Sequence, residues 1–199
     1  MKKWTVIFAV ALAVCAIAVA CGRNKPSGQA AAETQPNPSD LLLGKFDADS
    51  AYDFVARQVA FGPRVPGSEG HRACRQFIID RLKAYGADSV MIQDGVVTAF
   101  NGDKLPITNI IGGYNITTSR RILLIAHWDT RPWADKDDKL DERHRPIDGA
   151  NDGASGVAVL LEIARNLAQK NPNVGVDLMF VDAEDYGDSS AFDPREDTW

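Results

Sequence analysis

Cysteine is scarce in this chain of 199 residues, and positive charge is not in excess. Of the three cysteines, Cys15, Cys21 and Cys74, only Cys74 lies beyond residue 21. The remainder of the chain therefore has no internal disulfide framework, and its stability must come from a hydrophobic core. The formal net charge of -5 gives no basic footprint for nucleic acid, so we expect no nucleic acid among its partners.

One long apolar run stands near the N-terminus, at residues 4–20, directly after two lysines. Its length suits a signal peptide and falls just short of a membrane span, although an uncleaved membrane anchor remains an alternative. Small residues precede Cys21, as in a bacterial lipobox, which predicts that Cys21 is lipidated. We expect a lipoprotein signal peptide at residues 1–20 and a polar, flexible tether at 21–44. The protein is then exported and membrane-anchored, facing the periplasm or the cell envelope.

Apolar residues recur at helical spacing in three segments and form strand-like runs in four. The predicted helices carry Tyr52, Val55 and Val59; Cys74, Phe77, Ile78, Leu82 and Tyr85; and Val157, Leu160, Leu161, Ala164 and Leu167. The predicted strands are residues 89–100, 105–112, 121–126 and 176–181. The strand at 121–126 is apolar on both faces, as an interior strand would be. Strand, loop, helix and strand from 121 to 181 make a crossover unit. The sequence therefore predicts an α/β fold with a mixed, largely parallel central sheet flanked by helices on both faces.

The second predicted helix begins after Ser68, whose hydroxyl can cap it. His71 lies on the first turn of this helix, where we expect a surface histidine rather than a ligand. Cys74 is expected to be a small buried apolar residue on the same helix. We therefore expect this part of the chain to be scaffold.

Acidic residues and one histidine stand where the predicted elements meet the edge of the sheet. His127 and Asp129 close one strand. Asp152 opens the following helix, and Glu184 and Asp185 follow the next strand. These side chains are expected to converge, because sites in parallel sheets form at the carboxyl ends of strands. So many acids repel one another unless a cation neutralises them, and the mixed nitrogen and oxygen donors favour zinc.

Each of these residues also has an ordinary structural explanation. Asp152 could be only a helix N-cap. His127 could be a hydrogen-bonded core residue, and the acidic pair after the last strand could be a solvated loop. Trp128 and Trp133 could line a substrate pocket or serve only the fold. The order in which these residues occur together is what favours a site.

Three ordered motifs resemble those of the zinc-dependent exopeptidase family, which includes aminopeptidases and glutaminyl cyclases. They are AHWDT at 126–130, GANDGASGVAVLLEIARNL at 149–167 and VDLMFVDAEDYGD at 176–188. Upstream, FGPRVPGSEG at 61–70 is similar to the GPR-x-x-GS segment that precedes the family's catalytic core. The resemblance runs from about residue 46 to the end of the chain. Through HWDTRPWAD and the acidic pair, the likeness is greatest to bacterial glutaminyl-peptide cyclotransferases, which are acyltransferases.

The resemblance implies a role for each site residue. Asp152 and Asp185 match zinc ligands, and Glu184 matches the general acid/base next to a ligand. His127 matches a residue that binds a second zinc in two-metal aminopeptidases and stands without that ion in the cyclases. Asp129 matches the aspartate that supports this histidine.

The implied reaction converts the N-terminal glutamine of a peptide or protein to pyroglutamate and releases ammonia. A single zinc would act as Lewis acid, and Glu184 would carry a proton from the α-amine to the departing ammonia. A two-zinc aminopeptidase that releases N-terminal residues is an alternative function. A non-catalytic surface lipoprotein on the same fold is an alternative of another class.

The family's last zinc ligand is a histidine well downstream of the acidic pair. The three histidines of this chain, His71, His127 and His144, all precede Glu184. We therefore expect the sequence to be truncated, with residues 45–199 forming the N-terminal part of the catalytic domain and the fold incomplete at the C-terminus. A product of this length alone is predicted to be inactive.

Overall fold

The computed structural model describes residues 45–170 and 172–188, all of which belong to one compact unit, Leu43–Trp199. The predicted signal peptide, the tether and Cys21 lie outside the described residues. None of the described helices combines the length and the apolarity that a membrane span requires.

Helices and strands form close to the segments in which the apolar pattern predicts them. The helices are α2 (Ala48–Ala60), α3 (Glu69–Ala84) and α4 (Ala154–Gln169). The strands are β1 (Ser89–Thr98), β2 (Lys104–Tyr114), β3 (Arg121–His127) and β4 (Gly175–Val181), and a short 3-10 helix, η1 (Glu184–Tyr186), follows β4.

Side chains cap the N-termini of α2 and α3 but not that of α4, and the cap at Ser68 is the one that the sequence predicted. Asp47 accepts two backbone N–H bonds from the first turn of α2, and Ser68 accepts one from the first turn of α3. In contrast, α4 begins after Gly153, which has φ 88° and provides no side-chain cap. Asp152 is therefore not the N-cap of α4, and its carboxylate needs another explanation.

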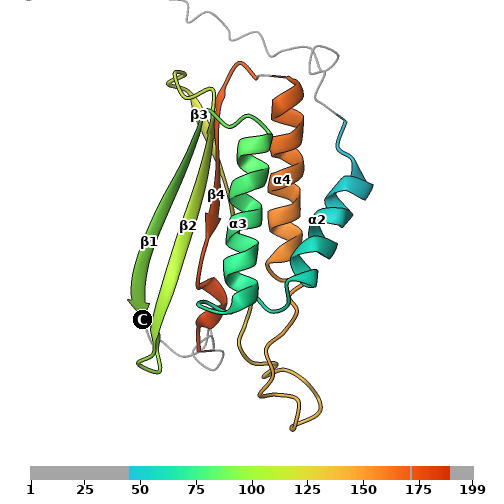
Figure 1. The fold of residues 1–199 in the computed structure, drawn as a ribbon, viewed down its shortest axis with the longest axis vertical. Coiled ribbons are helices and arrows are strands. Elements are labelled where there is room, and N and C mark those ends of the chain that lie inside the picture. The colour runs from blue at the N-terminus through green and yellow to red at the C-terminus, as the bar shows by residue number, and fades with distance from the viewer. Residues whose placement is uncertain (1–44, 171, 189–199) are drawn as a thin grey trace, which may run out of the picture. The chain divides into compact units, whose positions relative to one another are not determined.

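The described strands form one mixed sheet in the order β1-β2-β4-β3 (Figure 1). The α/β class is confirmed, and β3, α4 and β4 form the predicted crossover unit, with β3 and β4 parallel. The other two pairings, β1 with β2 and β2 with β4, are antiparallel, contrary to the predicted largely parallel sheet. The difference arises because the turn at Gly102 folds β1 and β2 into a hairpin, and β2 then pairs with β4.

The described helices lie on one side of the sheet (Figure 1). α3 contacts β1 and β2, α4 contacts β3 and β4, and α2 packs against α4. The predicted helices on both faces are therefore not found within the described residues. β3 is an edge strand of this sheet rather than an interior one, and Leu123 and Ile125 are 54% and 56% exposed. Both faces of β3 are apolar and could be buried, which is why the sequence predicted an interior strand. Among the described elements, none covers its second face.

The core lies between the sheet and the helices. Its largest fully buried apolar side chains are Trp128, Phe180, Ile78, Leu82, Ile110, Leu161, Leu178 and Val157. α3 approaches β2 closely, since a Cβ on Gly112 would lie 2.7 Å from Leu82 Cδ2. Cys74 is fully buried in this core, as predicted.

Gly70 is the residue at which the first turn of α3 meets the preceding turn. A Cβ there would lie 2.6 Å from the carbonyl oxygens of both Phe61 and Pro63. Overpacking in Gly70→Ala should destabilise the fold by about 1–3 kcal/mol. The higher helix propensity of alanine should stabilise it by only ~1 kcal/mol, so the free energy of unfolding measured in urea should fall. The control is Gly95→Ala, whose Cβ would meet only Ile107 side-chain atoms, the nearest at 3.6 Å. It should change stability by about 0.5 kcal/mol or less. An unchanged Gly70→Ala stability would contradict the close approach.

Candidate metal centre

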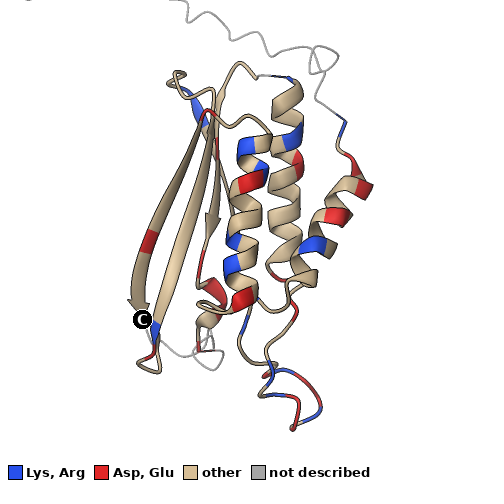
Figure 2. Cartoon of the chain, viewed as in Figure 1, with Lys and Arg blue, Asp and Glu red and all other residues tan. Residues whose placement is uncertain are grey.

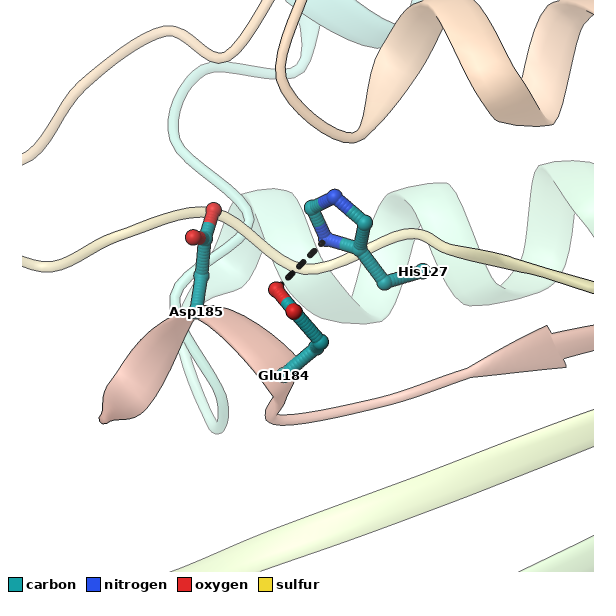
Figure 3. Close-up of side chains that lie close together, drawn as sticks. All are labelled: His127, Glu184 and Asp185. Carbon is teal, nitrogen blue, oxygen red and sulfur yellow. Dashed lines mark ion pairs between the residues drawn. The ribbon is translucent and has the colours of Figure 1, made fainter. Parts of the chain in front are cut away.

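The parallel pairing of β3 and β4 brings the ends of the two strands together. His127, the last residue of β3, is paired in register with Val181, the last residue of β4. The residues that follow both strands therefore meet at one edge of the sheet. There η1 presents Glu184 and Asp185 on the side where the His127 ring lies (Figure 3).

Three of the carboxylates predicted to form the site lie near the His127 ring. Donor atoms of His127, Glu184 and Asp185 all lie within 4.8 Å of each other. Asp152 Oδ1 is 3.2 Å from His127 Nε2, and Glu184 Oε2 is 3.9 Å from His127 Nδ1. The imidazole thus has a carboxylate at each of its nitrogens. The Asp152 and Glu184 side chains are 59% and 61% exposed, so a ligand from solution can reach both.

Asp129 is the buried carboxylate of the group, with a side chain that is 0% exposed. Its Oδ1 accepts the Glu184 N–H at 3.2 Å, and its Oδ2 accepts the Asp185 N–H at 3.1 Å. Asp129 Oδ1 also lies 3.6 Å from His127 Nδ1, beyond ordinary hydrogen-bond length. Asp129 therefore fixes η1 against the end of β3 as well as standing behind the histidine. Only its support of the histidine was predicted, because the two backbone contacts depend on the path of η1.

The carboxylates shift the ionisation of their neighbours. The Asp129 carboxylate, helped by Asp185 and Glu184, raises the pKa of His127 to about 9 against the opposing effect of burial. Burial, followed by the nearby Asp152 carboxylate, raises the pKa of Asp185 to about 6. Asp185 Oδ2 is buried and has no hydrogen-bond partner among the described residues. This edge of the sheet therefore favours a bound cation.

Arg64, in the upstream GPR segment, is fully buried and holds the loop that leads to Asp152. Its guanidinium donates to the backbone carbonyls of Asp148 and, at 2.8 Å, Gly149. Its backbone N–H donates to Thr130 Oγ1 at 2.8 Å. Arg64 thus connects the turn before α3 to the segment after β3 and to the loop before α4. The motif was the only sequence signal for this role, and it did not identify the partners.

The sequence predicted a surface position for His71. In the structure this residue is buried, with only 4% of its surface exposed. Its ring stacks on Trp128, with centroids 4.2 Å apart and planes at 20°. Helical spacing was the missed signal, because His71 lies on the same face of α3 as the buried Cys74, Ile78 and Leu82. Trp128 is itself 0% exposed and donates its indole N–H to a β2 carbonyl at 3.1 Å. Of the two roles left open for Trp128, the structural one is therefore correct.

The long loop between β3 and α4 reaches back to η1. Arg131 donates to the backbone oxygens of Asp185 and Gly187 at 2.9 and 3.0 Å. Trp133 lies edge-on to Tyr186, with ring centroids 5.2 Å apart. Figure 2 shows that this loop carries both signs of charge, whereas η1 is acidic. The loop therefore places a basic and an aromatic side chain beside η1, which we call the acidic turn.

Comparison with known proteins gives this site a family context. Residues 109–192 match peptidase family M28. A glutaminyl cyclase of Bacteroides thetaiotaomicron, solved with N-acetylhistamine bound, has 50% sequence identity over 76% of this chain and 51% of its own, with a TM-score of 0.73. A leucine aminopeptidase precursor from Bacteroides thetaiotaomicron VPI-5482 has 52% identity over 73% of this chain and 50% of its own, with a TM-score of 0.72. The glutaminyl-peptide cyclotransferase of Bos taurus is 30% identical over 132 residues, 61% of this chain and 35% of its own.

The chain spans about half the length of these two solved structures and about a third of the bovine protein. Both kinds of enzyme named by the sequence resemblance, glutaminyl cyclases and exopeptidases, are among the similar proteins, so the predicted resemblance is confirmed. Residues 109–192 therefore match peptidase family M28, and the described fold is shared with bacterial glutaminyl cyclases and zinc-dependent exopeptidases.

Proposed function

We propose that this protein is a zinc-dependent glutaminyl-peptide cyclotransferase acting on peptides or proteins with an N-terminal glutamine. The observation that carries the proposal is the group of His127, Glu184 and Asp185 at the ends of β3 and β4, with Asp152 beside the imidazole from the loop before α4. This group occurs in a chain with 50% identity to a bacterial glutaminyl cyclase. The reaction converts the glutamine to pyroglutamate and releases ammonia.

The residues present fit part of a zinc site. Asp185 offers a buried oxygen with no hydrogen-bond partner among the described residues, and Asp152 offers an exposed carboxylate near the same imidazole. Zinc accepts such carboxylate and imidazole donors. We assign Asp152 and Asp185 as ligands and keep His127, backed by Asp129, in a supporting position. A zinc ion bound there would supply Lewis acidity toward the side-chain carbonyl of the glutamine.

Glu184 is suited to move the proton. Its backbone N–H donates to Asp129, which fixes the backbone at this position. Its side chain is 61% exposed, so the carboxylate is accessible to a substrate. It takes a proton from the substrate α-amine as that nitrogen bonds to the side-chain carbonyl carbon. It then gives the proton to the departing ammonia as the amide carbon–nitrogen bond breaks. The amine and the carbonyl belong to one residue, so no water is consumed.

A two-zinc aminopeptidase is the second candidate, and the position of His127 favours it. His127 Nε2 lies 3.2 Å from Asp152 Oδ1, so the imidazole could ligate a second ion that shares this carboxylate. The similarity to a leucine aminopeptidase precursor, at 52% identity, is comparable to that to the cyclase, at 50%. In that reaction water, rather than the α-amine, would be the nucleophile.

An assay of the complete gene product on a glutaminyl peptide and on a leucyl anilide separates these two functions. We expect ammonia release and a pyroglutamyl product from the glutaminyl peptide, with one zinc per molecule by atomic absorption. Release of free leucine at a comparable or higher rate, with two zinc ions per molecule, would instead establish the aminopeptidase.

The replacement Glu184→Gln tests the proton transfer. It removes the basic carboxylate and keeps the size of the side chain, so kcat on the glutaminyl peptide should fall by about 10²–10⁴-fold. The zinc content should not change. The control Glu142→Gln alters a glutamate of the long loop that pairs with Arg145, and it should leave kcat unchanged. Retained turnover in Glu184→Gln would remove the proton-transfer role, and loss of zinc would make Glu184 a ligand.

We also propose that the protein is exported and anchored to a membrane through a lipid on Cys21, because an apolar run and small residues precede this cysteine. In a bacterial host, Cys21→Ala should abolish incorporation of radiolabelled palmitate and, as seen by mass on a gel, the removal of residues 1–20. Cys15→Ala, inside the apolar run, should leave both properties unchanged. Labelling that persists in Cys21→Ala would contradict the proposed anchor.

A further inference from the structure

His71 and Asp182 form a buried pair behind the acidic turn. His71 Nε2 lies 2.8 Å from Asp182 Oδ2, and the two side chains are 5% and 0% exposed. The pair joins the first turn of α3 to the residue that follows β4, two positions separated by 111 residues in sequence. Neither residue has a part in the proton transfer or in the ligand set proposed above.

The neighbours of His71 define which ring nitrogen carries the proton. The Gly67 N–H points at Nδ1 over 3.4 Å, so Nδ1 is an acceptor. Nε2 is then the nitrogen that donates to the carboxylate of Asp182. The stacking on Trp128 holds the plane of the ring. His71 is thus fixed both in orientation and in the direction of its hydrogen bond.

The carboxylate of Asp182 collects donors from three parts of the chain. Besides the His71 ring, its Oδ2 accepts the Thr108 N–H of β2 at 2.6 Å. Its Oδ1 accepts the N–H of the next residue, Ala183, at 2.8 Å. The backbone N–H of Asp182 donates to Asn109 Oδ1 at 3.1 Å. Asp182 therefore links α3 and β2 to the start of the acidic turn.

The turn that follows needs support on both sides. Ala183 has φ 60° and ψ 25°, in the left-handed region that is unfavourable for a residue with a Cβ. Asp182 holds the N–H of Ala183, and Asp129 holds those of Glu184 and Asp185. The left-handed residue thus directly follows the buried carboxylate of Asp182 and directly precedes the acidic pair, whose backbone N–H groups donate to the buried carboxylate of Asp129.

We propose that His71 is a positioning residue for the acidic pair. By donating a hydrogen bond to Asp182, it holds the left-handed turn at Ala183 that presents Glu184 and Asp185 to the metal centre. His71 acts through Asp182 and reaches neither the substrate nor the metal. The expected effect of His71 on zinc affinity rests on the proposed function. The positioning of the acidic pair is a property of the fold and can be measured without zinc.

Amide hydrogen exchange of the zinc-free complete gene product, followed by NMR, tests the positioning. His71→Phe keeps a ring against Trp128 and removes the donor. The amides of Ala183, Glu184 and Asp185 should then exchange about tenfold faster or more, as expected for loss of a hydrogen bond to a charged group. The amide of Leu178, in the core of β4, should exchange as before. Equal acceleration at Leu178 would show a global loss of stability and overturn the local role.

Two further variants and one control complete the comparison. His71→Gln places a side-chain N–H near the position of Nε2 and should restore most of the protection. His71→Asn has a shorter side chain that cannot reach Asp182, and it replaces the phenylalanine variant if that variant does not fold. The control His144→Phe changes an exposed histidine of the long loop and should have no effect. Unchanged exchange in both His71→Phe and His71→Asn would overturn the positioning.

Titration with Zn²⁺ by calorimetry measures the consequence for the site. The dissociation constant should rise about tenfold in His71→Phe, in line with the lost hydrogen bond, and recover in His71→Gln. Faster exchange with an unchanged zinc affinity would overturn the role of His71 in the metal centre. A wild-type chain that binds no zinc would contradict the proposed metal centre, and the exchange rates would still decide the positioning.

Discussion

The buried carboxylate of Asp129 is the interaction on which the rest of the site depends. Burying a carboxylate is unfavourable unless hydrogen bonds compensate for the lost water. Here the donors are the backbone N–H groups of Glu184 and Asp185, the two residues that the site has to place. The same two hydrogen bonds therefore stabilise the buried charge and position the acidic pair. Asp129 also favours the charged form of His127, so it acts on both sides of the cluster.

Behind the acids lies a layer of buried polar side chains that belong to the upstream part of the chain. Arg64 holds the loop before α4 through backbone carbonyls, and His71 holds Asp182 at the end of β4. Buried polar groups are unfavourable when only partly satisfied, so such a layer permits few arrangements of the backbone around it. The segment around the GPR motif is thus more than a connection between α2 and α3. It holds the loop that leads to Asp152 and the turn that leads to Glu184 and Asp185.

The sequence predicted the elements of this structure better than their assembly. Helix and strand periods, the cap at Ser68 and the convergence of His127 with the acidic pair all follow from local pattern and from the crossover rule. The strand order does not, because the insertion of β4 between β2 and β3 depends on pairings between distant segments. The burial of His71 was visible in the spacing of α3, but its partner Asp182 was not, since the two meet only when the sheet and the helix are assembled.

The start of α4 has an electrostatic consequence for the acids. Gly153 lies against the site, since a Cβ on it would fall 2.7 Å from the Asp129 carbonyl oxygen and 3.5 Å from His127 Cε1. The first turn of an α-helix presents backbone N–H groups without intrahelical partners, and together they amount to roughly half a positive charge. The positive end of the α4 macrodipole therefore offsets part of the repulsion among the carboxylates, whether or not a cation is bound. The backbone of a helix that itself contributes no ligand thus helps to set the charge balance of the metal centre.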